Sequence, residues 1–246
     1  GVQTCALPIS IADMPGTVRA GKQVVSWGES TFIGNSINSI NPIDVSAFRR
    51  PGAEIKEGLI PVNMLFASQG LTDKLSVEAF YQLEWDETVV DNCGTFFGSD
   101  VVAEGCNNNY TVGSPAIKPL QPIAAAFGQG FDVTPEGVVV RRAGNRYARD
   151  SGQWGTALRW LGDDTEYGLY FMNYHSRSPV LSTKTAGLAT LGAIPSIVGA
   201  ANAVAPGTGS GLAQSTMLGN GQYYLEYPED IQLYEIGRAS CRERVF

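Results

Sequence analysis

Residues 58–86 and 151–175 share one pattern, in which a strand, a very short polar turn and a second strand follow one another. In the clearest strand, residues 75–86, apolar residues alternate with polar ones, and only Phe80 breaks the alternation. Because successive side chains of a strand point to opposite faces, such a strand has one apolar face and one polar face. The pattern predicts antiparallel hairpins that separate two different surroundings.

Further strands are expected outside the two hairpins. Residues 17–28 alternate in the same way, and residues 223–234 do so with an interruption at Pro228. With the hairpins these segments make six strands. The apolar residues 137–140 predict one more short strand, and a short helix is expected near residues 45–50.

The connections between the six strands are very unequal in length. The hairpin turns near residues 71–74 and 162–165 are short, whereas long loops are expected at residues 29–57, 87–150 and 176–222. A soluble sandwich usually has short connections throughout. Short turns at one end and long loops at the other are typical of an outer-membrane β-barrel.

The expected fold class is therefore all-β, an antiparallel transmembrane β-barrel fragment with short periplasmic turns and long extracellular loops. Six strands are too few to close such a barrel, because about eight is the smallest common number. Aromatic residues near the strand ends suit the girdles of a barrel, with ordinary core packing as the alternative. These residues are Trp85, Trp154, Trp160, Tyr167 and Tyr223.

The alternation also assigns side chains to the two faces of the predicted barrel wall. The polar face would line the lumen through Glu78, Gln82, Glu84, Gln153 and Arg159. The apolar face would contact outer-membrane lipid through Leu75, Val77, Tyr81, Leu83, Leu158 and Trp160.

The two ends of the chain have a different character. Residues 1–9 and 236–246 resemble translated sequencing adapters, and segments of that origin are excluded from fold reasoning. We expect residues 10–235 to form a partial outer-membrane β-barrel, an internal piece of a longer protein.

Two cysteines, Cys93 and Cys106, remain within residues 10–235 and lie in one polar loop. A disulfide between them would contribute roughly 3 kcal/mol by loop-closure entropy. It would indicate an oxidising compartment such as the periplasm or the cell surface. Two free thiols are the alternative. A metal site is disfavoured, because two cysteines without nearby histidines do not complete a tetrahedral set.

Charge and motifs exclude several classes of function. The formal net charge of −7 argues against nucleic-acid binding. The sequence contains no nucleophile elbow and no glycine-rich nucleotide loop. The single histidine, His175, follows a predicted strand and is expected to be structural. We expect no enzyme activity, no cofactor and no metal.

Residues 187–205 are almost wholly apolar or small, yet Pro195 and the many Ala and Gly residues argue against a transmembrane helix. A loop over or inside the mouth of the barrel is expected instead. It could receive a hydrophobic ligand, or it could be a plug packed on its own neighbours. The candidate ligand residues are Leu188, Leu191, Ile194, Ile197 and Val198.

Several stretches resemble an uncharacterised family of Gram-negative outer-membrane proteins that is classified as a domain of unknown function. The resemblance runs through residues 13–234 and is clearest at 19–30, 41–45, 50–54, 148–153, 170–177 and 224–230. It implies a β-barrel, a location in the cell outer membrane, and export or uptake of hydrophobic compounds, with possible envelope transport partners. It implies no catalytic residues.

The sequence thus supports a porin-like channel or transporter for hydrophobic or lipid-like compounds. A secreted soluble β-sandwich, acting as a binding module or adhesin, is the alternative. An outer-membrane enzyme with its site in the long loops is a third hypothesis, and no motif supports it.

Overall fold

A computed structural model describes residues 4–28, 37–103, 105–106, 109–113, 115, 133–134 and 136–240. The chain divides into two compact units. Unit 1 comprises Gly1–Val89, Tyr147–Pro179 and Tyr227–Phe246, and unit 2 comprises Val90–Arg146 and Val180–Glu226. Unit 2 is therefore formed by the two segments that interrupt unit 1 in the sequence.

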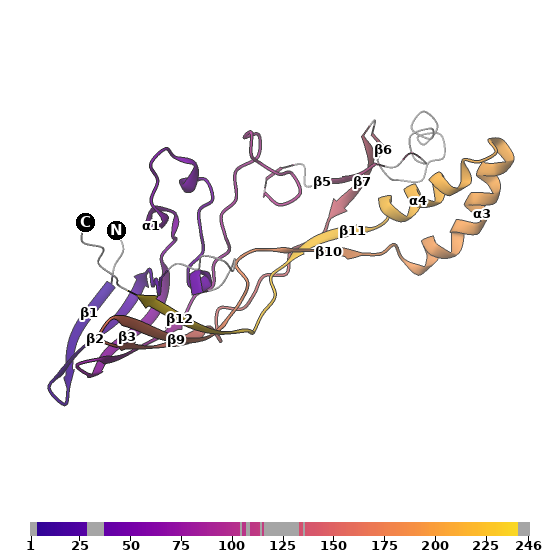
Figure 1. Ribbon diagram of the computed structural model, residues 1–246. Helices are drawn as coiled ribbons and strands as arrows, with labels where there is room; N and C mark the ends of the chain where they lie inside the picture. The colour runs from indigo at the N-terminus through magenta and orange to yellow at the C-terminus, as the bar shows by residue number, and fades with distance from the viewer. Residues whose placement is uncertain are drawn as a thin grey trace. The chain divides into compact units, whose positions relative to one another are not determined.

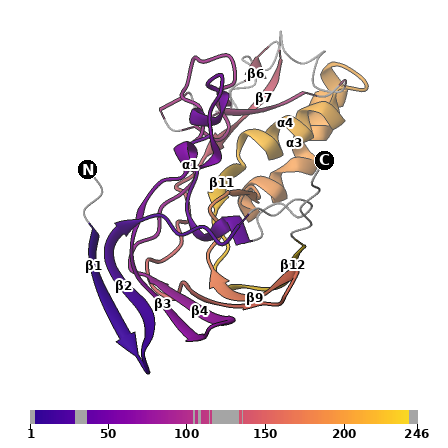
Figure 2. The same cartoon turned by 60° about the vertical axis from the view of Figure 1, so that its left-hand side comes forward.

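Unit 1 is built on an antiparallel sheet whose seven strands have the order β1-β2-β3-β4-β8-β9-β12. The strands are β1 (Thr4–Ile11), β2 (Met14–Gln23), β3 (Val62–Thr72), β4 (Leu75–Gln82), β8 (Trp154–Leu161), β9 (Thr165–Tyr174) and β12 (Ile231–Ser240). Figure 1 shows the sheet, and Figure 2 shows its curvature. Three short helical turns belong to the same unit: η1 (Ile37–Ile40), η2 (Ala47–Arg49) and α1 (Ile55–Gly58).

Both hairpins predicted from the alternation are confirmed as β3–β4 and β8–β9. The second turn closes through the backbone N–H of Gly162, which donates to the carbonyl oxygen of Thr165 at 2.8 Å. The Lys74 ammonium contacts the Asp163 carboxylate at 2.7 Å and so joins the two neighbouring turns. The short helical turn expected near residues 45–50 is present as η2.

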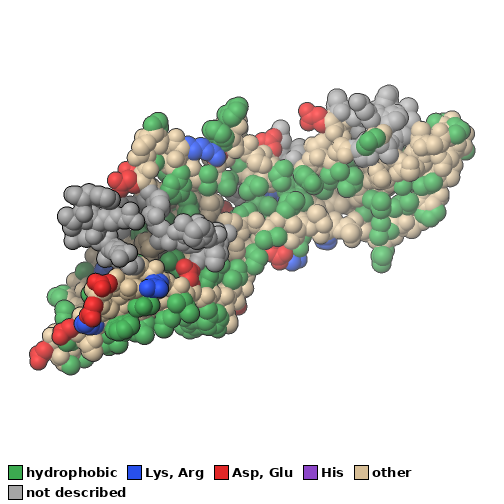
Figure 3. Space-filling model, viewed as in Figure 1, with side chains coloured by type: hydrophobic (Ala, Val, Ile, Leu, Met, Phe, Trp, Pro, Cys, Tyr) green, Lys and Arg blue, Asp and Glu red, His purple; other side chains and the backbone are tan. Residues whose placement is uncertain are grey.

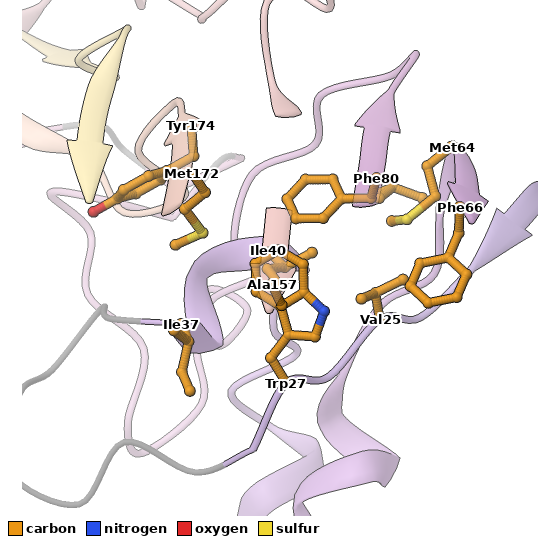
Figure 4. Packing of buried hydrophobic residues seen from close by; sticks show 11 residues of the cluster. Val25, Trp27, Ile37, Ile40, Met64, Phe66, Phe80, Ala157, Met172 and Tyr174 are labelled. Atoms are coloured by element: carbon orange, nitrogen blue, oxygen red, sulfur yellow. The ribbon is translucent and has the colours of Figure 1, made fainter. Parts of the chain in front are cut away.

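The inner face of this sheet carries a hydrophobic core. Strands β3, β4, β8 and β9 supply Val62, Met64, Phe66, Phe80, Ala157, Met172 and Tyr174. The chain that follows β2 covers these residues with Val25, Trp27, Ile37 and Ile40. In Figure 4, Trp27 lies among Phe80, Ala157 and Ile40. The inward position of Phe80 explains why it breaks the alternation of its strand.

The outer face of the same sheet exposes large apolar side chains. They include Leu65, Tyr81, Leu83, Trp154, Trp160, Tyr167, Leu169, Tyr234 and Ile236. Figure 3 shows hydrophobic side chains gathered over the β9–β12 part of the sheet. The unit therefore buries one face of its sheet and leaves an apolar surface on the other.

Unit 2 corrects the expectation of long loops at residues 87–150 and 176–222. Its sheet has the order β10-β11-β7-β5, with β6 paired to β7, and only the β11–β7 pair is parallel. The strands are β5 (Asn109–Val112), β6 (Val133–Thr134), β7 (Gly137–Arg142), β10 (Val180–Lys184) and β11 (Gln222–Glu226). The short strand expected at residues 137–140 is confirmed within β7.

Helices α3 (Leu188–Val204) and α4 (Gly209–Gly219) also belong to unit 2 and pack against each other. The expected loop at 187–205 is wrong, because most of that segment is helix α3, with Pro195 inside it. Helix α3 turns Ile194, Ile197 and Val198 to its half-buried side, at the spacing of one helical face. No helix in the described part of the chain is both long and apolar enough to cross a membrane.

The single strand expected at residues 223–234 is also wrong. Residues 222–226 form β11 in unit 2, and residues 231–240 form β12 in unit 1. Pro228, which lacks a backbone N–H, and Asp230, whose φ is 55°, lie between the two strands and prevent one continuous ladder. Strands β1 and β12 also extend into residues 1–9 and 236–246, whose origin as adapter segments stays a prediction.

Over the described residues the fold is thus mostly β, with two antiparallel-dominated sheets and the two helices α3 and α4 besides the short helical turns. The seven strands of unit 1 form an open sheet over the described residues.

Candidate functional site

The inner face of the unit 1 sheet holds a buried polar cluster around Arg177. This side chain is 5% exposed and donates to the carbonyl oxygens of Asp86 at 2.9 Å and Ile40 at 3.2 Å. It also donates to Oε1 of Gln82, whose Nε2 donates to the Ile40 carbonyl at 2.5 Å. Burial lowers the pKa of Arg177 to about 10. The cluster fastens the η1 turn to strand β4.

A second buried amide, Asn41, ties the same covering segment to its surroundings. Its Nδ2 donates to the carbonyls of Gln23 at 3.3 Å and Ile60 at 3.0 Å, and its Oδ1 accepts from the N–H of Val25 at 3.0 Å. The roles of Asn41 and Arg177 were not predicted from the sequence. Both lie in the stretches that carry the family resemblance, which was the available signal.

The predicted lumen residues mostly lie on the inner face of the sheet, where the segment that follows β2 covers them. Gln82 and Gln153 are fully buried, Glu78 is half-buried, and Arg159 donates to the Trp27 carbonyl at 3.2 Å. Glu84 lies beyond the end of β4 and contacts the Lys22 ammonium at 3.4 Å. A packed core and side chain–backbone hydrogen bonds occupy the face at these positions, and its assignment to a lumen stays a prediction.

The predicted lipid-facing residues share the opposite face, as their pairing shows. Val77 pairs with Leu158, and Leu75 pairs with Trp160. Tyr81, Leu83 and Trp160 are exposed, whereas the other three are half-buried. Two of the aromatic residues expected near an interface are instead buried, since Trp85 packs on Tyr227 and Tyr223 lies in the unit 2 sheet.

His175 has a structural position. Its Nδ1 accepts from the backbone N–H of Asp230 at 3.0 Å, so the ring is the tautomer whose Nε2 donates to the Ser151 carbonyl at 2.9 Å. Both nitrogens therefore hold loop backbone. In the described residues no three His, Cys, Asp or Glu side chains gather in a way that could hold a metal ion.

Beside His175, an exposed ionic cluster joins the loops before β8 and before β12. The guanidinium of Arg149 contacts Glu229 at 2.5 Å and both carboxylate oxygens of Asp230 at 2.6 Å. These hydrogen bonds, with one from Asn173, hold the pKa of Asp230 below its usual range.

Because the pKa of Asp230 is lower in the folded than in the unfolded state, this carboxylate stabilises the fold at pH values above its unfolded pKa, about 4. The stabilisation is lost as the pH falls through the folded pKa. We therefore expect Asp230→Asn to flatten the loss of stability on the acid side. The difference between the urea unfolding midpoints at pH 7 and pH 3 measures this loss of stability. Asp73→Asn, in an exposed turn, is the control. Equal acid sensitivity of wild type and Asp230→Asn would contradict the role of this cluster.

The predicted disulfide is confirmed, because Cys93 and Cys106 are bonded with their Cα atoms 5.3 Å apart. It closes a loop of unit 2 that carries Phe96, an almost fully exposed side chain. Of the residues assigned to an artefactual end, Cys5 is a free, exposed thiol.

Unit 2 contains an apolar cavity of about 290 Å³ between its sheet and its two helices. Its walls include Val112, Val140, Leu191, Met217 and Leu218. The polar lining residues are Tyr110, Thr183, Thr185 and Gln222, which are neutral, and Lys184, which is charged. Of the candidate ligand residues, Leu191 lines the cavity, whereas Ile194, Ile197 and Val198 are half-buried and Leu188 is 87% exposed. This volume lies just below the range of about 300–1,000 Å³ for small-molecule pockets.

The comparison with known protein families gives a match over most of the chain. The family described as "Protein of unknown function (DUF1302)" matches residues 8–237. No curated protein and no solved structure matches the chain.

Proposed function

This chain belongs to the DUF1302 family of proteins of unknown function, and on that premise we propose that it forms part of the wall of an outer-membrane β-barrel. The barrel binds or passes a hydrophobic or lipid-like compound in a Gram-negative bacterium, acting as a porin-like channel or transporter. It uses no cofactor, and its immediate partner is outer-membrane lipid.

The observation that carries the proposal is the apolar outer face of the unit 1 sheet. Across four adjacent strands, Val77, Leu158, Leu169 and Ile236 lie side by side on this face. A soluble monomer rarely exposes a continuous apolar surface of this extent. In a membrane barrel, such a surface is the one that contacts acyl chains.

Aromatic pairs bound this apolar surface at both ends. Trp154 pairs with Tyr81 at one end, and Trp160 pairs with Tyr167 at the other. The six-residue separation of Trp154 and Trp160 along β8 corresponds to roughly 20 Å of strand. The apolar band of outer-membrane barrels is about 25 Å tall and lies between two aromatic girdles. The proposed wall therefore has suitable dimensions.

The proposal also requires closure of the sheet. Seven strands are fewer than the roughly eight of the smallest common barrels, so further strands complete the wall. Open strand edges would leave backbone groups without partners in hydrocarbon, which the bilayer does not tolerate. The hairpin turns that contain Lys74 and Asp163 face the periplasm in this arrangement.

Tryptophan quenching by brominated lipid tests the proposal. Trp154 and Trp160 are exposed on the outer face, whereas Trp27 and Trp85 are buried. We expect vesicles of acyl-brominated phosphatidylcholine to quench the chain, and the double variant Trp154→Phe/Trp160→Phe to lose most of this quenching. Quenching of the same two residues by aqueous iodide instead of lipid would overturn the proposal.

A secreted soluble binding module or adhesin remains the second candidate. The exposed Phe96 on the disulfide-closed loop is the observation that favours it, because exposed aromatic residues often anchor protein interfaces. The second candidate predicts a folded chain in the aqueous fraction and no lipid quenching.

A further inference from the structure

The cavity of unit 2 has one sheet wall and one helical wall. Strands β5, β7 and β10 contribute Tyr110, Val140 and Thr183 to the sheet wall. Helices α3 and α4 contribute Leu191, Met217 and Leu218. All these residues belong to one unit, so the cavity does not depend on the position of unit 1.

The register of the unit 2 sheet separates its charged residues from this cavity. Gln222 pairs with Lys184 on one side and Arg141 on the other, so these three side chains share one face. Thr183 and Val140 are one residue away in their strands and therefore face the opposite side. Lys184 thus borders the cavity, although its place in the strand puts its side chain on the other face, with Gln222 and Arg141.

The face of the sheet that carries Lys184 and Arg141 also carries an ion-paired carboxylate, Glu226. Glu226 lies four residues after Gln222 in β11, and Gln222 pairs with Lys184. Because side chains an even number of residues apart in a strand share a face, Glu226 and Lys184 lie on the same face of the sheet. Its carboxylate contacts Arg146 at 3.3 Å and accepts from the hydroxyl of Ser182 at 3.1 Å. Arg146 also lies over the Tyr224 ring at 4.7 Å. Ion pairing in this sheet is therefore concentrated on the face away from the cavity.

The cation on the cavity side of the sheet, Arg142, is two residues beyond Val140 and does not line the cavity. Its guanidinium is committed to Asn145 Oδ1 and to the carbonyl of Ala103, each at 3.2 Å. The helical wall adds no charge, because no charged residue occurs between Lys184 and Glu226.

We infer that this cavity binds an uncharged, largely apolar small molecule, with neutral polar contacts supplied by Tyr110, Thr183 and Thr185. A carboxylate or ammonium group placed there would lose part of its hydration, which is unfavourable. Among the described lining residues only Lys184 is charged, and its side chain belongs to the other face of the sheet. The inference rests on the proposed handling of hydrophobic compounds and narrows it to neutral ones.

A pair of fluorescent probes with the same ring system tests the inference. N-phenyl-1-naphthylamine is neutral, and 1-anilinonaphthalene-8-sulfonate is its anionic analogue. We expect the full chain to bind the neutral probe at least about tenfold more tightly than the anion, because the apolar lining removes part of the hydration of the sulfonate. The signal is taken as the difference between variants in identical vesicles or detergent, which removes the background.

Two substitutions one helical turn apart locate the binding site. Leu191→Trp fills the cavity and should reduce the affinity for the neutral probe at least about tenfold. Leu188→Trp adds the same ring at an exposed position of α3 and should leave the affinity unchanged. Met217→Trp fills the cavity from α4 and serves as the second test if Leu191→Trp does not fold, which circular dichroism reports.

Equal binding of the two probes, or equal affinities of both filling variants and Leu188→Trp, would overturn the inference. Loss of lipid quenching at Trp154 and Trp160 with intact probe binding would instead contradict the membrane proposal alone. The two results are therefore distinguishable.

Discussion

Leu169→Arg is expected to abolish assembly of the chain into lipid vesicles, whereas Gln232→Arg should leave it nearly intact. Leu169 is 51% exposed at the middle of the apolar outer face, beside Leu158 and Ile236. An arginine at the lipid-facing midplane of a barrel costs about 2–4 kcal/mol, and one near the interface about 0–1 kcal/mol. Gln232 lies on the same face but at its edge, because it pairs with Asn173, which in turn pairs with Trp154.

Heat-modifiable gel mobility and co-sedimentation with vesicles measure the two variants. A water-facing sheet predicts little effect of either variant, since exposed surface substitutions usually change stability by less than about 0.5 kcal/mol. Equal behaviour of the two variants would therefore reject the lipid-facing assignment. Gln82→Arg is not a suitable control despite its polar side chain, because Gln82 is buried and hydrogen-bonded to Ile40 and Arg177.

Trp27→Ala is expected to destabilise unit 1 by about 3–5 kcal/mol, the usual cost of removing a buried tryptophan. Trp27 is 3% exposed and packs on Phe80 and Tyr170, with ring centroids 5.1 Å and 5.8 Å apart. It belongs to the chain that covers the inner face of the sheet. Its removal leaves a cavity between this covering segment and strands β4 and β8.

Trp160→Ala is the matched control, because Trp160 is 50% exposed and stacks only on Tyr167 in the described aromatic pairs. Such a pair contributes about 0.5–1.5 kcal/mol, so this variant should lose less than half as much stability as Trp27→Ala. Denaturant unfolding monitored by near-ultraviolet circular dichroism measures both. If both losses were equal, the covering segment would not be packed on the sheet as described.

The sequence was a good guide to elements that local pattern determines. The alternation around Val77 and Leu158 placed both hairpins, and the short polar turns placed their ends. Cys93 and Cys106 were close enough in one polar loop to predict their disulfide. Phe80, the exception to the alternation, marked the inner core that the sequence analysis did not recognise.

The same reasoning failed where pairing joins distant segments. Residues 87–150 and 176–222 have little periodicity by themselves, because unit 2 forms only when β7 pairs with both β5 and β11. Helix α3 has no charged residues and includes Pro195, and its half-buried side becomes interpretable only beside α4. The buried hydrogen bonds of Asn41 to Ile60 and of Arg177 to Gln82 likewise join residues far apart in sequence.

By itself, the sequence determined the hairpins, the two faces of their strands and the disulfide, because a period of two residues, a short turn and a short loop are local properties of the chain. Only the tertiary structure decided that the segment following β2 covers the polar face of the unit 1 sheet. It also decided that residues 223–234 divide between two sheets and that an apolar cavity lies between α3, α4 and the unit 2 sheet. These features depend on contacts between segments far apart in sequence, and burial by such segments leaves no periodic signal in either one.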